Sequence, residues 1–169
     1  MKKAVCFLLV LFFINFVFAQ SSVLKIGQPA PAISLPAPNG DIQTLSSLKD
    51  KLVLIDFWAT WCAPCVKEQS ELKALYTKHI NQVKAEKFEI LGVSLDKSKD
   101  NWRKSIKHLK IDWIQVSDLM FWKSPVAKEY GIEDLPFNVL VNEQGNIVAI
   151  NLHGKALEDF VGKYLMKSL

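Results

Sequence analysis

The chain has 169 residues, a formal net charge of +4, 50% hydrophobic residues and 22% charged residues. This composition is far too apolar for a disordered protein, and the length fits one domain. The small, scattered excess of positive charge argues against a nucleic-acid partner held by charge. The absence of an apolar run of twenty residues argues against a multi-span membrane protein.

Residues 1–19 have the pattern of a secretory signal peptide. Two lysines precede an apolar stretch, and Val17 and Ala19 suit signal-peptidase cleavage before Gln20. We therefore expect an exported, periplasmic protein whose single domain spans residues 20–169. The alternative is an uncleaved segment that anchors the protein in the membrane, although the apolar run is short for a span.

The elements predicted next along the chain are short. Residues 20–40 are rich in Ser, Pro and Gly and read as extended chain around a strand at 32–35. Residues 39–41 form a turn signal that leads to a second strand at 42–44. Ser46 is expected to cap one helical turn.

The middle of the chain alternates buried strands with helices. Residues 52–58 read LVLIDFW, which is typical of a strand covered on both faces. The apolar period then becomes helical over residues 63–83. The positions expected to face inward on this helix are Val66, Leu72, Leu75, Tyr76 and Ile80. Further strands are predicted at 88–95 and 113–116, and further helices at 100–109 and 125–130.

The C-terminal part is predicted to contain a hairpin and a final helix. The hairpin strands lie at residues 137–141 and 146–152, and the helix at 156–166. Helix-separated strands followed by a hairpin predict an α/β fold with a mixed central β-sheet flanked by helices on both faces.

Two cysteines, Cys62 and Cys65, lie beyond the signal segment, which holds the third. They are three residues apart, so a bridge between them cannot join distant parts of the fold. Cys62 is expected at a helix N-terminus, where free N–H groups and the helix dipole stabilise a thiolate. Cys65 lies one turn further on, within reach of a mixed disulfide formed by Cys62. This arrangement indicates thiol–disulfide exchange.

Other uses of a cysteine pair fit less well. A structural zinc site needs four ligands, and the histidines stand alone, without a second cysteine pair, so we expect no metal. Haem attachment requires a histidine where Val66 stands. We therefore expect no cofactor. An inert disulfide in a loop is the remaining alternative.

Residues 57–65 read FWATWCAPC and resemble the active-site run of the thioredoxin superfamily. Residues 27–35, Glu68 and residues 144–147 are similar to the exported TlpA/ResA-like thiol–disulfide oxidoreductases of that superfamily. The resemblance implies a thioredoxin-like fold with an N-terminal extension. It also implies an inserted helix–strand segment over residues 96–130.

The same resemblance implies roles for individual residues. Cys62 would attack the client disulfide and Cys65 would resolve the mixed disulfide, the two forming a redox-active disulfide between turnovers. Pro136, in cis, would present the backbone of Leu135 to the client and shield the sulfurs. Trp61 would form a platform beside Cys62. The alternative for Pro136 is an ordinary proline at the start of a strand.

Two acidic residues are candidates for proton transfer. Asp56 lies six residues before Cys62, where thioredoxins carry a buried acid, and burial would raise its pKa. It could then take the proton of Cys65 as that thiol attacks; the alternative is an exposed acid without a role. Two interpretations of Glu68 stay open, a supporting acid behind the cysteines or a solvated residue of the first helical turn.

We therefore predict an exported thiol–disulfide oxidoreductase that works as a reductase. Its expected partners are the thiols and disulfides of exported client proteins, for example apocytochrome c before haem attachment, and a membrane electron donor; the protein itself is expected to be a monomer. One alternative is a peroxiredoxin-like thiol peroxidase, but Ile55 and Ala59 do not fit the peroxidatic P-x-x-x-[TS]-x-x-C pattern. The other is a binding module with vestigial cysteines.

Overall fold

A five-stranded mixed sheet forms the centre of the computed structural model, which describes residues 24–167. The strands lie in the order β5-β4-β3-β6-β7. Their bounds are β3 (Leu52–Trp58), β4 (Phe88–Ser94), β5 (Ile114–Val116), β6 (Phe137–Val141) and β7 (Ile147–Ile150). The central strand β3 pairs parallel with β4 and antiparallel with β6, and all of its residues are buried. The signal-peptide prediction lies outside the described residues.

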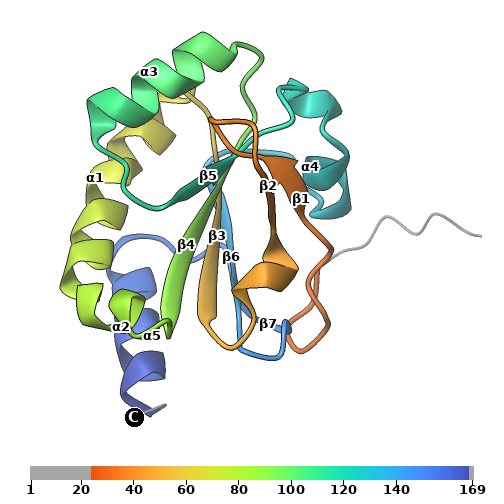
Figure 1. Ribbon diagram of the computed structural model, residues 1–169. Coiled ribbons are helices and arrows are strands. Elements are labelled where there is room, and N and C mark those ends of the chain that lie inside the picture. Colours follow the sequence, from red (N-terminus) through yellow and green to blue (C-terminus); the bar gives the residue numbers. More distant parts are fainter. Residues whose placement is uncertain (1–23, 168–169) are drawn as a thin grey trace, which may run out of the picture.

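One face of the sheet is covered by long helices (Figure 1). These are α1 (Ala63–Lys78), α3 (Lys99–Leu109) and α5 (Gly154–Lys167), with the short α2 (Ile80–Lys84) after α1. Side chains alternate along a strand, so Leu52, Leu54 and Trp58 share this face with Asp56 between them. The apolar ones pack with Leu72, Trp102 and Leu157 from the helices.

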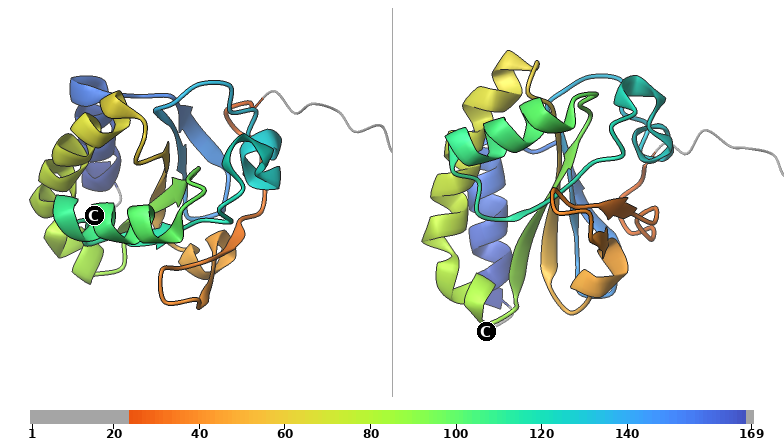
Figure 2. Two further views of the ribbon diagram at one scale, coloured as in Figure 1. Left: turned by 90° about the horizontal axis from the view of Figure 1, so that it is seen from above. Right: turned by 45° about the horizontal axis from the view of Figure 1, so that its top comes forward.

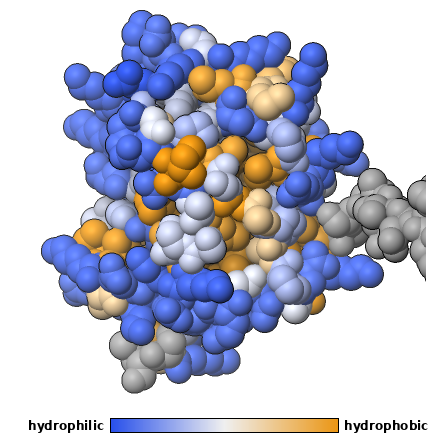
Figure 3. Space-filling view, turned by 45° about the vertical axis from the view of Figure 1, so that its right-hand side comes forward, coloured by the Kyte–Doolittle hydropathy of each residue, from blue (hydrophilic) through white to orange (hydrophobic). Residues whose placement is uncertain are grey.

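The other face is covered by shorter elements, which Figure 2 shows from two further directions. They are the two-stranded sheet of β1 (Ser34–Pro36) and β2 (Ile42–Thr44), the 3₁₀ helices η1 (Leu45–Leu48) and η2 (Phe121–Lys123), and α4 (Pro125–Glu129). Val53, Ile55 and Phe57 of β3 pack here against Tyr130. Figure 3 shows hydrophobic side chains near the centre of this side of the molecule, with hydrophilic ones around them.

The predicted fold class is therefore confirmed: a thioredoxin-like α/β domain whose mixed sheet has helices on both faces. The strands predicted at 42–44, 52–58 and 137–141 have the predicted bounds. None of the helices within residues 24–167 is long and apolar enough to cross a membrane.

Two local predictions are wrong. The helix predicted over 63–83 is interrupted at His79, which ends α1 and precedes α2. His79 is buried there, and Ile80, which was expected to face inward, is exposed. The turn at η1 is capped by Thr44 instead of Ser46, since Thr44 Oγ1 accepts the Ser47 N–H at 3.1 Å.

Candidate active site

The redox pair lies where β3 gives way to α1. Cys62 is the N-cap residue of α1, and it forms a disulfide with Cys65 across a Cα–Cα distance of 5.3 Å. The backbone N–H of Cys65 donates to Cys62 Sγ at 3.2 Å. Cys62 keeps 6% of its surface exposed, whereas Cys65 has none. After reduction, the helix N-terminus would stabilise a thiolate on the more accessible sulfur, Cys62.

Hydrogen bonds to residues at the end of β4 hold the loop that precedes Cys62. The backbone N–H of Thr60 donates to Asp96 Oδ2 at 3.1 Å, and its hydroxyl donates to Oδ1 at 2.6 Å. Ser94 Oγ donates to the same carboxylate at 2.8 Å. These bonds tie the approach to the cysteines to the end of the neighbouring strand. The sequence around Asp96 carries no motif that would have marked it for this role.

Asp56 is buried beneath α1, with 2% of its surface exposed. Burial raises its pKa from 3.8 to about 7; the hydrogen bond from Gln69 opposes this rise, the negative charge of Glu68 adds to it, and His153 opposes it. Gln69 Nε2 donates to Asp56 Oδ2 at 2.9 Å. The alternative of an exposed, idle acid is therefore wrong. A carboxyl group with this pKa can take up and release a proton near neutral pH.

Glu68 is buried as well, with 9% of its side chain exposed. Its Oε1 lies 2.7 Å from His153 Nδ1, and the other ring nitrogen of His153 lies 2.8 Å from Asn151 Oδ1. Glu68 therefore faces the interior, and the solvated alternative is wrong. His153 is a functional candidate that the sequence did not reveal, because it stands alone in a loop far along the chain.

Asn138 connects the loop that carries His153 to the central sheet. It lies opposite Asp56 in the antiparallel pairing of β3 and β6. The side-chain amide of Asn138 donates to the Leu152 carbonyl at 2.6 Å and accepts the Leu152 N–H at 3.1 Å. The backbone carbonyl of Asn138 accepts the Asn151 N–H at 2.7 Å. The neighbour of Asp56 thus sets the loop that carries His153. A polar residue in an apolar strand was the available signal.

Aromatic side chains gather beside the cysteines. Trp61 is 47% exposed, and its Nε1 donates to the Leu95 carbonyl at 3.3 Å. Its ring lies 5.0 Å from that of Phe121 and 6.0 Å from that of Trp122, measured between centroids. We call Trp61, Phe121 and Trp122 the aromatic surface.

The predicted cis-proline loop contains a cis peptide bond between Leu135 and Pro136. Leu135 is partly buried and packs against both core clusters, one of which includes both cysteines. The loop therefore contacts the core on both faces of the sheet, including the cluster that holds the redox pair. Among residues 24–167 no group of three or more His, Cys, Asp or Glu side chains is placed to hold a metal ion.

Comparison with known proteins gives matches over most of the chain. The model of the AhpC/TSA family matches residues 26–150. The thiol–disulfide oxidoreductase ResA of Bacillus subtilis is 32% identical over 151 residues, which cover 89% of this chain and 80% of that protein.

Two solved structures share the fold. A thiol–disulfide oxidoreductase of Bacteroides fragilis superimposes with a TM-score of 0.76 at 34% identity, covering 81% of this chain and 99% of that one. The thioredoxin domain of a thiol–disulfide oxidoreductase of Bacteroides vulgatus gives a TM-score of 0.76 at 35% identity, covering 83% and 98%.

Proposed function

Since the chain belongs to the AhpC/TSA family, as a ResA-like thiol–disulfide oxidoreductase, we propose that it works as an exported, periplasmic reductase of client protein disulfides. The observation that carries this proposal is the Cys62–Cys65 disulfide at the start of α1 with the buried Asp56 beneath the same helix. The pattern of residues 1–19 supports export.

The proposed reaction has two steps. In the reduced protein, the Cys62 thiolate attacks a client disulfide, which gives a mixed disulfide and releases one client thiolate. Cys65 then passes its proton to Asp56 and attacks the Cys62 sulfur. The mixed disulfide breaks, the Cys62–Cys65 disulfide forms, and the second client thiolate leaves with the electron pair. The client gains two electrons and the protein loses two.

The client would approach over the exposed side of the redox pair. Trp61 lies next to Cys62 in the chain and is half exposed. We propose that it and the backbone of Leu135, before the cis Pro136, contact the polypeptide around the client cysteine. A membrane electron donor would reduce the Cys62–Cys65 disulfide after each turnover, and apocytochrome c is one candidate client. The protein would act as a monomer.

Trapping tests the roles of the two cysteines. Cys65→Ser leaves Cys62 able to attack a client but removes the thiol that resolves the intermediate, so mixed disulfides should accumulate. We expect this variant, expressed in cells, to yield exported proteins bound through Cys62. The matched control is Cys62→Ser, which should trap none. Trapping by Cys62→Ser alone would reverse the two roles.

The reduction potential of the Cys62–Cys65 couple tests the direction of electron flow. Equilibration with glutathione or dithiothreitol buffers should give a value near that of thioredoxin, about −270 mV. A value near that of DsbA, about −120 mV, would make the protein an oxidant. A peroxide-consumption assay with Cys65→Ser separates the peroxidase alternative, for which rapid turnover at Cys62 is expected.

A further inference from the structure

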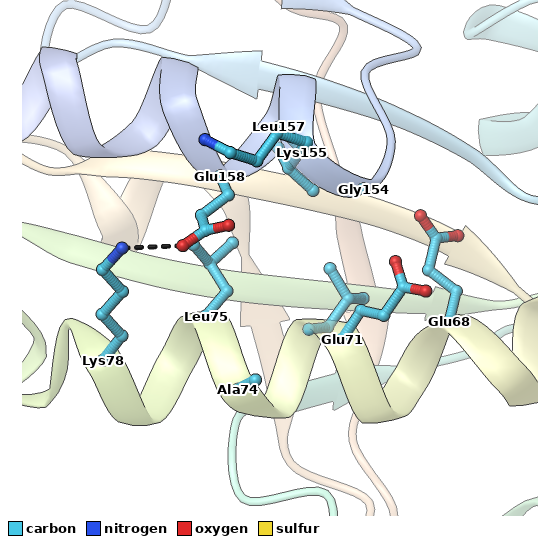
Figure 4. A pocket seen from close by; sticks show the side chains of 10 residues that line it. Glu68, Glu71, Ala74, Leu75, Lys78, Gly154, Lys155, Leu157 and Glu158 are labelled. Atoms are coloured by element: carbon cyan, nitrogen blue, oxygen red, sulfur yellow. Dashed lines mark hydrogen bonds and ion pairs between the residues drawn. The ribbon is translucent and has the colours of Figure 1, made fainter.

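Glu68, the partner of His153, lines a pocket of about 420 Å³ between α1 and α5. Figure 4 shows the Glu68 carboxylate reaching from α1 toward the start of α5, at one end of this pocket. The side chain of His153, the residue before α5, is 37% exposed, while that of Glu68 is 9% exposed. The pair therefore joins the buried acids behind the cysteines to the surface.

Both ring nitrogens of His153 lie within hydrogen-bond distance of side-chain oxygen atoms. Glu68 Oε1 lies at one ring nitrogen and Asn151 Oδ1 at the other, at 2.7 and 2.8 Å. Both oxygens are acceptors, so the ring satisfies both when each nitrogen carries a proton, as in the imidazolium form. Glu68 Oε2 has no hydrogen-bond partner among residues 24–167. A protonated ring would therefore be the direct compensation for the Glu68 carboxylate.

The other charged groups around the pair have their own partners or add negative charge. Asp56 faces the pair from β3, Glu71 and Lys78 from α1, and Lys155 and Glu158 from α5. Lys78 Nζ lies 2.7 Å from Glu158, and Lys155 is paired with Asp159. Neither lysine replaces His153 beside Glu68. Without the imidazolium, the acids would face an uncompensated negative charge.

We propose that His153 is a positioning residue of the disulfide exchange, which holds Glu68 behind the cysteines and supplies the positive charge that lets Asp56 give up its proton. This proposal rests on the role of Asp56 in the proposed function. A negative Glu68 makes Asp56 hold its proton more tightly, and a positive His153 weakens that hold. Asp56 must be ionised to accept the proton of Cys65, so His153 acts on the resolving step through its charge and through the position of Glu68.

The fold gives His153 a fixed place for this task. Asn138, opposite Asp56 in the sheet, bonds the backbone of residues 151 and 152 and so sets the position of the ring. The strand that pairs with β3 at Asp56 therefore also places the His153 ring.

The test follows the resolving step with a small disulfide, so it needs no client. Reduced protein reacts with Ellman's reagent: Cys62 forms a mixed disulfide, and Cys65 then releases the second thionitrobenzoate anion, which is read by stopped-flow absorbance. The rate of this second phase is measured from about pH 5 to about pH 9, where ionisation of Asp56 controls it. A failure of the client-trapping experiment would leave this measurement intact.

The variants separate charge from structure. His153→Gln keeps a donor to Glu68 but removes the charge, and it should move the midpoint of the pH profile upward by about 0.5 to 1 pH unit. His153→Arg keeps the charge and should keep the wild-type midpoint. Glu71→Gln, a neighbouring acid on α1 that is not bonded to His153, should move it downward or not at all. Equal midpoints for wild type and His153→Gln, or an upward shift in His153→Arg as large as in His153→Gln, would overturn the proposal.

A second measurement covers the case in which His153→Gln does not fold. Asn151→Ala leaves the ring in place and removes one of its acceptors, so it should shift the midpoint in the same direction by a smaller amount. The titration of the Asp56 carboxyl carbon, followed by ¹³C NMR in the oxidised protein, should move with the kinetic midpoint. An Asp56 titration that is the same in wild type and Asn151→Ala would also count against the proposal.

Discussion

At the scale of the residue, stability and the proposed proton transfer make opposite demands on Asp56. It is the polar member of an otherwise apolar strand, and burial raises its pKa from 3.8 to about 7. In the unfolded chain it ionises near its ordinary pKa of about 3.9. Below that pH it is protonated in both states and costs nothing. As the pH rises from about 4 to about 7, only the unfolded state ionises, and the folded state loses stability.

Asp56→Asn should therefore stabilise the oxidised protein at neutral pH. Asn keeps an oxygen to accept the Gln69 N–H and does not ionise, so the variant lacks the penalty, which is about 3 to 4 kcal/mol for three pKa units. Urea unfolding at several pH values should show the variant gaining on wild type from about pH 4 to about pH 7, with no further gain above. The same variant should resolve mixed disulfides more slowly. A wild-type resolving rate would transfer the acid–base role to Glu68.

The burial of Asp56 could be predicted from the sequence, whereas the burial of Glu68 could not. One carboxylate within LVLIDFW, six residues before a cysteine pair, predicts a buried acid because the strand has little other polarity. Glu68 could not be assigned in the same way, since a helical residue one turn after Cys65 can face the sheet or the solvent. The contact with His153 shows that Glu68 faces the interior. This contact forms because the chain returns to the sheet in β7, just before His153.

At the scale of the element, the strands were predictable and the helix ends were not. Mostly apolar runs mark β3, β4 and β6, because these strands are covered on both faces. The break at His79 carries no proline or glycine signal; the imidazole ring is buried there, 6.1 Å from the ring of Phe88 between centroids. The cap of η1 is displaced by two residues because both Thr44 and Ser46 are acceptable capping types.

On three neighbouring strands, a side chain packs closely over a glycine, and only the register of the strands reveals this contact. Asp56, Gly92 and Gln115 lie side by side on β3, β4 and β5. The absence of a side chain at Gly92 leaves room for Gln115, whose Oε1 accepts the Trp58 Nε1–H at 2.9 Å. A Cβ atom at Gly92 would lie 2.0 Å from Gln115 Nε2. The glycine is therefore required by this side chain.

Gly92→Ala should lower the free energy of unfolding by about 1 to 3 kcal/mol, because it displaces Gln115 from its bond to Trp58. In the double variant with Gln115→Ala, the added methyl group no longer meets that side chain, so the two losses should sum to more than the measured loss. Gly162→Ala on α5, where a Cβ atom meets nothing within 4 Å, is the control and should be neutral or stabilising. Additive losses in the double variant, measured by urea unfolding, would remove Gln115 as the cause.

At the scale of the whole molecule, the aromatic surface joins two parts of the chain that the sequence keeps apart. Trp61 precedes the first redox cysteine, and Phe121 and Trp122 belong to the inserted segment between β5 and α4. The sequence indicated a role for Trp61 through its place in the motif. It gave no such signal for Phe121 and Trp122, because their position depends on how the inserted segment crosses the end of the sheet.

The loop that carries these two aromatic residues is held in a fixed shape. Leu119 and Phe121 have φ values of 58° and 57°, a conformation that is costly for residues other than glycine. Ser124 Oγ donates to Asp118 Oδ2 at 2.6 Å and closes the loop, and Ser117 Oγ ties its start to the Ser94 carbonyl at 2.7 Å. Aromatic side chains held in place in this way lose little conformational freedom when they contact a client.

We therefore predict that the aromatic surface increases the rate with protein clients and leaves the rate with small disulfides unchanged. Trp122 is 40% exposed and has no part in the proposed proton transfers, so Trp122→Ala removes contact area without altering the cysteines. Loss of a large aromatic contact costs about 1 kcal/mol or more, which corresponds to a rate at least about five-fold lower for reduction of a protein disulfide such as insulin.

The rate of Trp122→Ala with Ellman's reagent should stay at the wild-type value. Met166→Ala, which removes an even more exposed apolar side chain near the end of α5, is the control and should change neither rate. Equal slowing of the protein and small-molecule reactions by Trp122→Ala would show that the surface supports the cysteines themselves and does not bind the client.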